Sequence, residues 1–169
     1  LCRLTEGKHV LESIEAFTQF HKIYPNYSLE IIGSGRQEEA CKALIDSKNA
    51  REYVRMLGWI DHEEVAEKTA RWEYLLFPTD TEGMPNSVIE MMAMGVPVIA
   101  SPVGGIPDII EHERNGWLLQ GTSDAEIYRA LCYAVEHSEH YSSMSEAAWQ
   151  TIGRHFTLEN ARKAACKNI

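Results

Sequence analysis

Glu82 and Glu90 are eight positions apart within the segment EGMPNSVIEMMAMGVPVIAS. Glu82 follows a short apolar run and is expected in a loop, whereas Glu90 belongs to a helix predicted over 88–94. With this spacing, a loop carboxylate and a helical carboxylate can converge on one crevice. Because carboxylates accept hydrogen bonds from paired hydroxyl groups, strongly when ionised, the pair suits a polyhydroxylated ligand.

Asn86 and Ser87 lie between the two glutamates, at the expected N-terminus of that helix. Their main-chain amides would face an anion there, and the helix dipole favours phosphate at this end. A simpler interpretation stays open. Ser87 and Glu90 have the three-residue spacing of a capping box, which would leave Glu82 as a solvated loop charge.

Two cations, Arg3 and Lys8, occur where the first predicted strand ends and the first predicted helix begins. Placed beside helix-terminal amides, they would neutralise a diphosphate as it departs from a reaction centre. Arginine and lysine are also ordinary surface residues at helix starts. The pair alone therefore does not distinguish a binding site from a solvated surface.

Short apolar runs alternate with amphipathic stretches along most of the chain, which is typical of a parallel sheet covered by helices. We therefore expect an α/β fold, a Rossmann-like open parallel sheet of about six strands with helices on both faces. Ligands bind such sheets at the carboxyl ends of the strands. Strands are predicted at 1–4, 28–32, 54–57, 74–77, 97–100 and 117–119, and helices at 8–20, 37–45, 61–70, 88–94 and 123–136, from Met144 and from Thr157.

The composition narrows the classes of partner. A chain of 169 residues fits one domain, or one lobe of a larger protein. Its formal net charge of -9 disfavours nucleic-acid binding, because phosphate backbones favour a basic surface. No apolar run reaches the roughly 18 residues of a membrane span, and no signal peptide is visible. We expect a cytoplasmic protein, with the parent protein also able to act at the cytoplasmic face of a membrane.

The cysteines and the start of the chain give two further expectations. The cysteines at positions 2, 41, 132 and 166 form no CxxC pair, so a metal or redox site is not predicted and reduced thiols are expected. The seven histidines show no metal-ligand spacing either. The chain begins at Leu1, inside a predicted strand. We therefore interpret it as a fragment of a longer polypeptide.

Glycines at the ends of predicted strands mark places of close approach or tight turns. Gly33-Ser34-Gly35 fails as a dinucleotide fingerprint because Glu38 replaces the third glycine, and a tight turn is the alternative. Gly104 and Gly105 would let a loop approach a ligand, or simply form a turn before the next helix. Trp59, which follows a strand end, is expected in the core rather than as a stacking surface.

The wider segment carries a family resemblance. A Glu-x7-Glu motif is followed by Gly-x-Pro-Val-Ile and by Gly-Gly-x-Pro with an acidic residue, formed here by Glu82, Glu90, Ala93, Gly95, Pro97, Val98, Ile99, Gly104, Gly105, Pro107 and Asp108. In this order the chain resembles the retaining glycosyltransferases of the GT-B fold known as group 1 or family 4. The resemblance covers residues 1–169 as the C-terminal, donor-binding lobe. Met84-Pro85 replaces the usual Phe-Gly.

The resemblance implies roles for individual residues. Glu90 would bind the ribose hydroxyls and Glu82 would contact the donor sugar. The family pattern Gly-Arg-Leu…Lys-Gly matches Arg3 and Lys8, which would stabilise the leaving diphosphate. The remaining donor-binding residues implied are Gly35, Trp59, Ile60, Gly83, Met84, Pro85, Asn86 and Ser87.

The function implied is transfer of a hexosyl group in glycan biosynthesis. A UDP-, GDP- or ADP-sugar would donate it, with retention at the anomeric carbon and without a metal cofactor. A glycan, lipid-linked or other acceptor would bind an N-terminal domain that this chain lacks, so the chain alone would bind nucleotide with little turnover. Two alternatives stay open: a sugar-nucleotide 2-epimerase of related architecture and a non-catalytic nucleotide-binding module.

Overall fold

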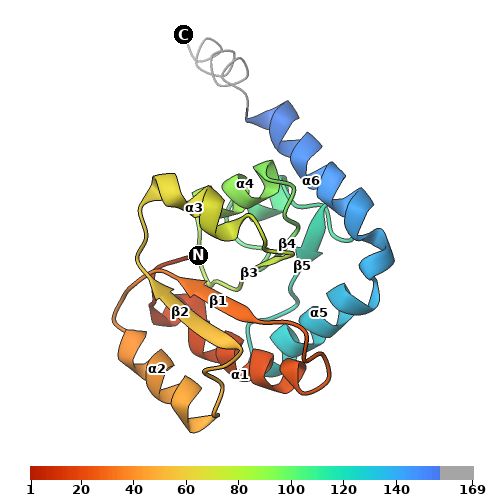
Figure 1. Cartoon of the computed structure of the whole chain (residues 1–169). Helices are drawn as coiled ribbons and strands as arrows, with labels where there is room; N and C mark the ends of the chain where they lie inside the picture. Colours follow the sequence, from red (N-terminus) through yellow and green to blue (C-terminus); the bar gives the residue numbers. More distant parts are fainter. Residues whose placement is uncertain (157–169) are drawn as a thin grey trace.

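The computed structural model describes residues 1–156, a chain in which strands and helices alternate (Figure 1). Each strand except the last is followed by a helix or a short 3-10 turn before the next strand begins. The strands are β1 (Leu29–Ile32), β2 (Val54–Gly58), β3 (Leu75–Phe77), β4 (Val98–Ala100) and β5 (Gly116–Leu118). The helices are α1 (Val10–His21), α2 (Glu38–Ser47), α3 (His62–Thr69), α4 (Asn86–Ala93), α5 (Asp124–Glu136) and α6 (Tyr141–His155), with 3-10 turns η1 (Glu6–Lys8), η2 (Ile106–Asp108) and η3 (Ser138–His140).

All strand pairs are parallel, which confirms the predicted α/β class. The strands form two groups, β1-β2 and β3-β4-β5, rather than the single sheet of about six strands that the sequence suggests. The strand predicted over 1–4 is one part of this difference. The amides of Cys2 and Leu4 donate to the carbonyls of Ile32 and Ser34 at 3.0 Å, but the segment forms no regular strand.

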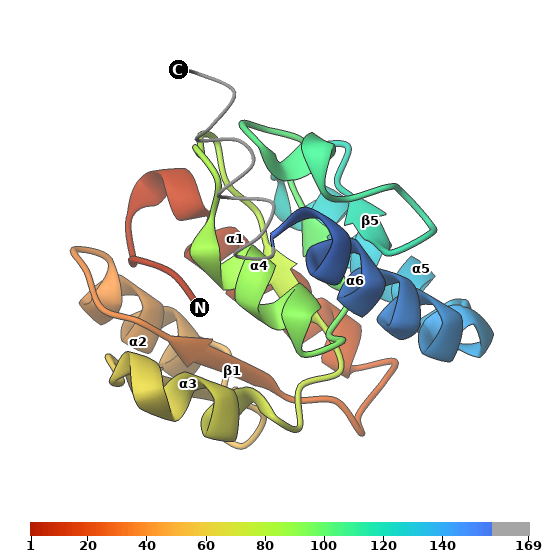
Figure 2. The same ribbon diagram turned by 90° about the horizontal axis from the view of Figure 1, so that it is seen from above.

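Strand β4 shows how the sequence produces a two-sided core. Its three residues are fully buried, as a continuous apolar run predicts for a strand covered on both faces. Ile99 joins an apolar cluster with α1, α2 and α5, whereas Val98 and Ala100 join a second cluster with α4 and α6. Successive strand residues point to opposite faces, so helices on both sides are required, as Figures 1 and 2 show.

The helix starts agree with the predicted capping signals in part. Ser123 is the N-cap of α5 and accepts a hydrogen bond from the amide of Glu126 at 3.3 Å. Asp61 is the N-cap of α3, but its side chain makes no capping bond. The helix predicted from Thr157, and Cys166, lie outside the described residues.

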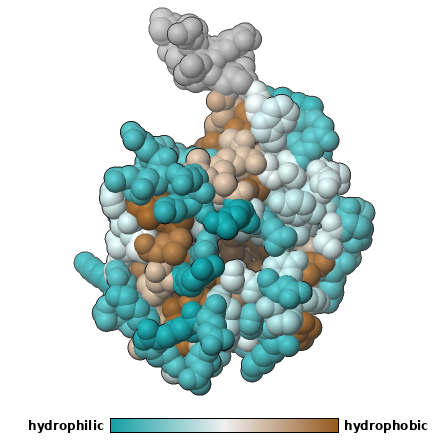
Figure 3. Space-filling model, viewed as in Figure 1, coloured by the Kyte–Doolittle hydropathy of each residue, from teal (hydrophilic) through white to brown (hydrophobic). Residues whose placement is uncertain are grey.

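A groove separates β1 from β3 on the face seen in Figure 3. It has a volume of about 580 Å³, and Tyr27, Arg55, Trp72 and Tyr74 are among the residues on its walls. Figure 3 shows hydrophobic residues within this hollow and hydrophilic residues around it. The indole N–H of Trp72 donates to Glu30 of β1 at 2.9 Å, which joins the two sides of the groove. Within residues 1–156, no helix combines the length and the apolar character that a membrane span needs.

Candidate functional site

A second cavity, of about 640 Å³, opens at the carboxyl ends of β1, β2 and β3. This is the end of a parallel sheet at which ligands bind. The main-chain segments after the three strands and the N-terminus of α4 form its walls. Most of the residues that the sequence singles out lie on these walls: Arg3, Lys8, Trp59, Ile60, Glu82, Pro85, Asn86 and Ser87.

Lys8 and Glu82 meet on the cavity wall. The Lys8 ammonium donates to the Glu82 carboxylate and, at 3.1 Å, to the hydroxyl of Thr79. It also lies 5.5 Å from the ring centroid of Phe77, close enough for a cation–π contact. The two charged side chains are 19% and 16% exposed, so the surrounding protein screens them less than bulk water would. The fold thus brings together two residues that the sequence places in separate motifs.

Thr79 connects the Lys8 turn to the end of β3. Its buried side chain donates to the carbonyl of Gly7 at 3.2 Å, and its amide donates to the hydroxyl of Ser101 at 2.9 Å. The amide of Asp80 donates to the same carbonyl of Gly7 at 3.0 Å. Sequence reasoning missed Thr79 and Asp80. Their signal was a pair of polar residues one position after the end of a buried strand, at the end of the sheet where ligands bind.

The loop that carries Glu82 rests on Gly104 and Gly105. A Cβ atom on Gly104, whose φ is 57°, would lie 2.0 Å from the main-chain oxygen of Glu82. The amide of Gly105 donates to the carbonyl of Gly83 at 2.7 Å, and a Cβ atom there would lie 2.5 Å from the Met84 methyl group. These glycines therefore allow one loop to contact another, which sequence reasoning did not anticipate.

Gly33 and Gly35 permit a similar close approach. A Cβ atom on Gly33 would lie 1.8 Å from the carbonyl oxygen of Cys2, and one on Gly35 would lie 2.4 Å from that of Leu4. The glycines thus make room for the main chain that carries Arg3, which is exposed on the cavity wall. Gly35 itself is not on that wall.

Helix α4 begins at Asn86, with Pro85 as its N-cap. Ser87 is therefore the second helical residue and is not placed to cap the helix, so the capping-box interpretation is wrong. The first amides of an α-helix have no acceptor within the helix. Those of Asn86 and Ser87 thus form a partly positive end beside the cavity, as a phosphate site requires.

Comparisons with known proteins show the family to which the chain belongs. Residues 1–151 match the family model of the glycosyl transferases group 1. The chain belongs to this family. It is 31% identical over 145 residues to the amylovoran biosynthesis glycosyltransferase AmsK of Erwinia amylovora, covering 82% of this chain and 35% of AmsK. It spans about a third of the length of the curated relatives it matches.

Solved structures show the same fold. HepE of Anabaena, in complex with UDP, has a TM-score of 0.86 and 19% identity, covering 99% of this chain and 47% of HepE. The C-terminal domain of LpcC, a glycosyl transferase group 1 family protein from Francisella tularensis, has a TM-score of 0.83 and 22% identity. That match covers 92% of this chain and 83% of the LpcC chain. The described residues therefore form one Rossmann-like lobe of a GT-B glycosyltransferase.

The expected convergence of Glu82 and Glu90 on one crevice is not found in this group 1 lobe. The Glu90 carboxylate is 3.7 Å from Nδ1 of His62, at the start of α3, and its side chain is 31% exposed. Glu90 is not among the residues on the cavity wall, whereas Glu82 is. Glu82 thus faces the cavity, whereas Glu90 contacts the start of α3.

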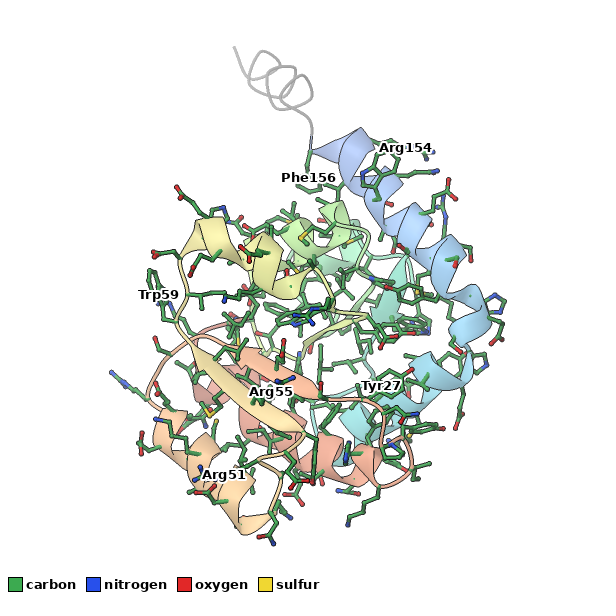
Figure 4. The ribbon with its side chains drawn as sticks, viewed as in Figure 1. Tyr27, Arg51, Arg55, Trp59, Arg154 and Phe156 are labelled. Atoms are coloured by element: carbon green, nitrogen blue, oxygen red, sulfur yellow. The ribbon has the colours of Figure 1, made fainter. Side chains whose placement is uncertain are left out.

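Trp59 departs from its expected place in the core of the lobe. The residue is 69% exposed, on the loop between β2 and α3 (Figure 4). The physical reason is Gly58, whose φ of 72° turns the chain as β2 ends. Trp59 thereby lies on the cavity wall instead, and Ile60 beside it packs partly against the apolar cluster around α4.

Metal-ligating groups do not cluster in the part of the lobe that the structure describes. No three His, Cys, Asp or Glu side chains within residues 1–156 are placed to hold a metal ion. Cys2, Cys41 and Cys132 are free thiols. Burial raises the pKa of Cys2, which lies on the cavity wall, and raises the pKa of Cys41 to about 11. These two thiols are therefore protonated at neutral pH.

Proposed function

We propose that this chain is the donor-binding domain of a hexosyltransferase that takes its sugar from a nucleoside diphosphate sugar. One observation carries the proposal. Arg3, Lys8 and the N-terminus of α4 surround a single cavity at the carboxyl ends of the strands. Two cations and a helix N-terminus are the groups that bind a diphosphate. The solved complex of HepE with UDP makes UDP the first nucleotide to test.

The proposed reaction follows from these positions. When the bond between the sugar and the diphosphate breaks, negative charge develops on the departing phosphate oxygen. Arg3, Lys8 and the amides of Asn86 and Ser87 stabilise that charge, which is the role that a metal ion has in other transferases. Glu82 orients the sugar hydroxyls near the reacting carbon, and Glu90 binds the ribose. The anomeric carbon then bonds to the oxygen of an acceptor hydroxyl group, which loses its proton, and the product retains the anomeric configuration of the donor.

We propose that a separate N-terminal domain binds the acceptor, which is a glycan, a lipid-linked saccharide or another hydroxyl compound. This division agrees with the third of its relatives' length that the chain spans. The parent protein acts in the cytoplasm or at the cytoplasmic face of the membrane. Residues 1–169 then suffice for donor binding but not for efficient transfer.

Calorimetric titration of the chain with UDP, GDP and ADP tests the proposal. We expect one nucleotide to bind clearly more tightly than the other two. If none binds at millimolar concentration, the donor-binding assignment is wrong. Product analysis with the full-length parent then separates transfer from its alternatives: a 2-epimerase would release a rearranged sugar, and a binding module would release no product.

A further inference from the structure

His9, the residue after Lys8, adopts an unusual backbone conformation. Its φ of 46° and ψ of 40° are left-handed, which is unfavourable for a residue with a Cβ atom. A glycine adopts these angles freely. A histidine that is only 15% exposed in such a place indicates that its side chain makes a compensating contact.

Both ring nitrogens of His9 face carboxylates. Nε2 lies 2.6 Å from Oδ1 of Asp80, and Nδ1 lies 3.6 Å from Oε1 of Glu12. Asp80 belongs to the loop after β3, and Glu12 belongs to the first turn of α1. The His9 ring therefore connects the first turn of α1 with the loop that follows β3.

The loop after β3 also contacts η1 through two other residues, Gly7 and Lys8. The carbonyl of Gly7 accepts hydrogen bonds from the amide of Asp80 and the hydroxyl of Thr79. The ammonium of Lys8 contacts Thr79 and Glu82. The contact between His9 and Asp80 lies next to these and fixes the chain on the C-terminal side of Lys8.

We propose that His9 is a positioning residue, whose contact with Asp80 holds η1 against the loop of residues 79–82 and so fixes the Lys8 ammonium in the cavity. The inference rests on the proposed function, because it treats the donor diphosphate as the ligand of Lys8. A lysine side chain has four rotatable bonds, so the ammonium reaches a defined point only if its main chain is held. The left-handed backbone of His9 thus lowers local stability, while its side-chain contact fixes the position of the Lys8 ammonium.

Two substitutions separate this role from a structural one. His9→Gly removes the ring and relieves the left-handed strain, so we expect the thermal midpoint to stay the same or rise while the affinity for UDP falls about tenfold. His9→Gln keeps the strain and offers an amide donor to Asp80, so we expect an affinity near that of the wild type with no gain in stability. A purely structural role predicts that affinity follows stability in both variants.

A control variant and a double-mutant cycle of His9 and Asp80 complete the test. Asn49 also has a left-handed φ, of 52°, but lies at the end of α2, away from the cavity. Asn49→Gly should match His9→Gly in stability while leaving the UDP affinity unchanged. Asp80→Ala should weaken UDP binding as His9→Gly does, and the double variant should be no weaker than either single variant, because both changes break one contact.

The outcomes distinguish a failure of the positioning role of His9 from a failure of the proposed donor-binding function. If the wild-type chain binds UDP and His9→Gly binds it equally well, or if the two changes are additive in the double variant, His9 does not position Lys8. If the wild-type chain binds no nucleotide at all, the proposed function fails and the inference fails with it.

Discussion

The ammonium of Lys8 contacts the carboxylate of Glu82, although the two residues come from the start of the chain and from the loop after β3. We propose that the Lys8 ammonium binds the donor diphosphate. In this structure it is already paired with Glu82. A diphosphate that binds Lys8 must share this ammonium with Glu82 or displace it. The residue that we propose orients the sugar would thus also compete with the phosphate for Lys8.

Glu82→Gln tests this competition. The substitution removes the negative charge while keeping the shape of the side chain, so we expect UDP to bind about three to ten times more tightly, as the loss of a competing charge worth on the order of 1 kcal/mol implies. Transfer by the full-length parent should nevertheless fall, because the carboxylate that we propose orients the sugar is gone. Titration calorimetry measures the first effect and product formation the second.

Glu111→Gln is the matched control for that experiment. Glu111 also contacts a cation, Arg114, but on the exposed surface away from the cavity. Its substitution should leave UDP binding unchanged. Weaker UDP binding by Glu82→Gln, with the control unaffected, would show that Glu82 supports the phosphate rather than competing with it.

Gly104→Ala should destabilise the lobe. The new methyl group would lie 2.0 Å from the main-chain oxygen of Glu82, and the left-handed φ adds strain, so the loop of residues 82–84 must move. We expect a loss of about 2–4 kcal/mol in the free energy of unfolding by urea, together with weaker UDP binding.

Gly153→Ala provides the comparison for Gly104→Ala. Gly153 lies in α6, and a Cβ atom there meets no atom within 4 Å. Alanine should therefore stabilise the helix by about 0.5–1 kcal/mol. Equal stability of the two variants would contradict the contact between Gly104 and the Glu82 loop.

The sequence predicts the parts of this lobe that depend on local pattern. Strand β4 is an apolar run at 97–100, and the N-cap at Ser123 follows from the spacing to Glu126. It does not predict contacts that need the tertiary structure. The contact of His9 with Asp80 joins residues far apart in the chain, and the exposed Trp59 follows the turn that Gly58 makes at the end of β2.

The two serines at helix starts give the third prediction. Ser123 caps α5, so Ser123→Ala should cost about 1 kcal/mol in unfolding free energy. Ser87 is the second residue of α4 and makes no capping bond, so Ser87→Ala should cost much less. Urea unfolding of both variants measures the difference. If the two losses are equal, Ser87 does cap the helix, and α4 does not start at Asn86.

Cys41 gives a prediction on alkaline pH. Burial in α2 raises the pKa of its thiol from 9.0 to about 11, so between these values the unfolded chain has lost the proton that the folded chain keeps. The folded state binds more protons than the unfolded chain in this range. The contribution of the Cys41 thiol to the free energy of unfolding therefore falls as the pH rises from about 9 to about 11. Below pH 9 that contribution is fully present.

Cys41→Ala should make the lobe less sensitive to alkali. The variant loses packing at every pH, but its unfolding free energy should decline less steeply than that of the wild type between pH 9 and 11, because the titrating group is gone. Urea unfolding at several pH values measures the two slopes, and Cys132→Ala, in α5, shows how much a less buried thiol contributes. Parallel declines for Cys41→Ala and the wild type would mean that other groups, such as the partly buried Tyr74, dominate the alkaline transition.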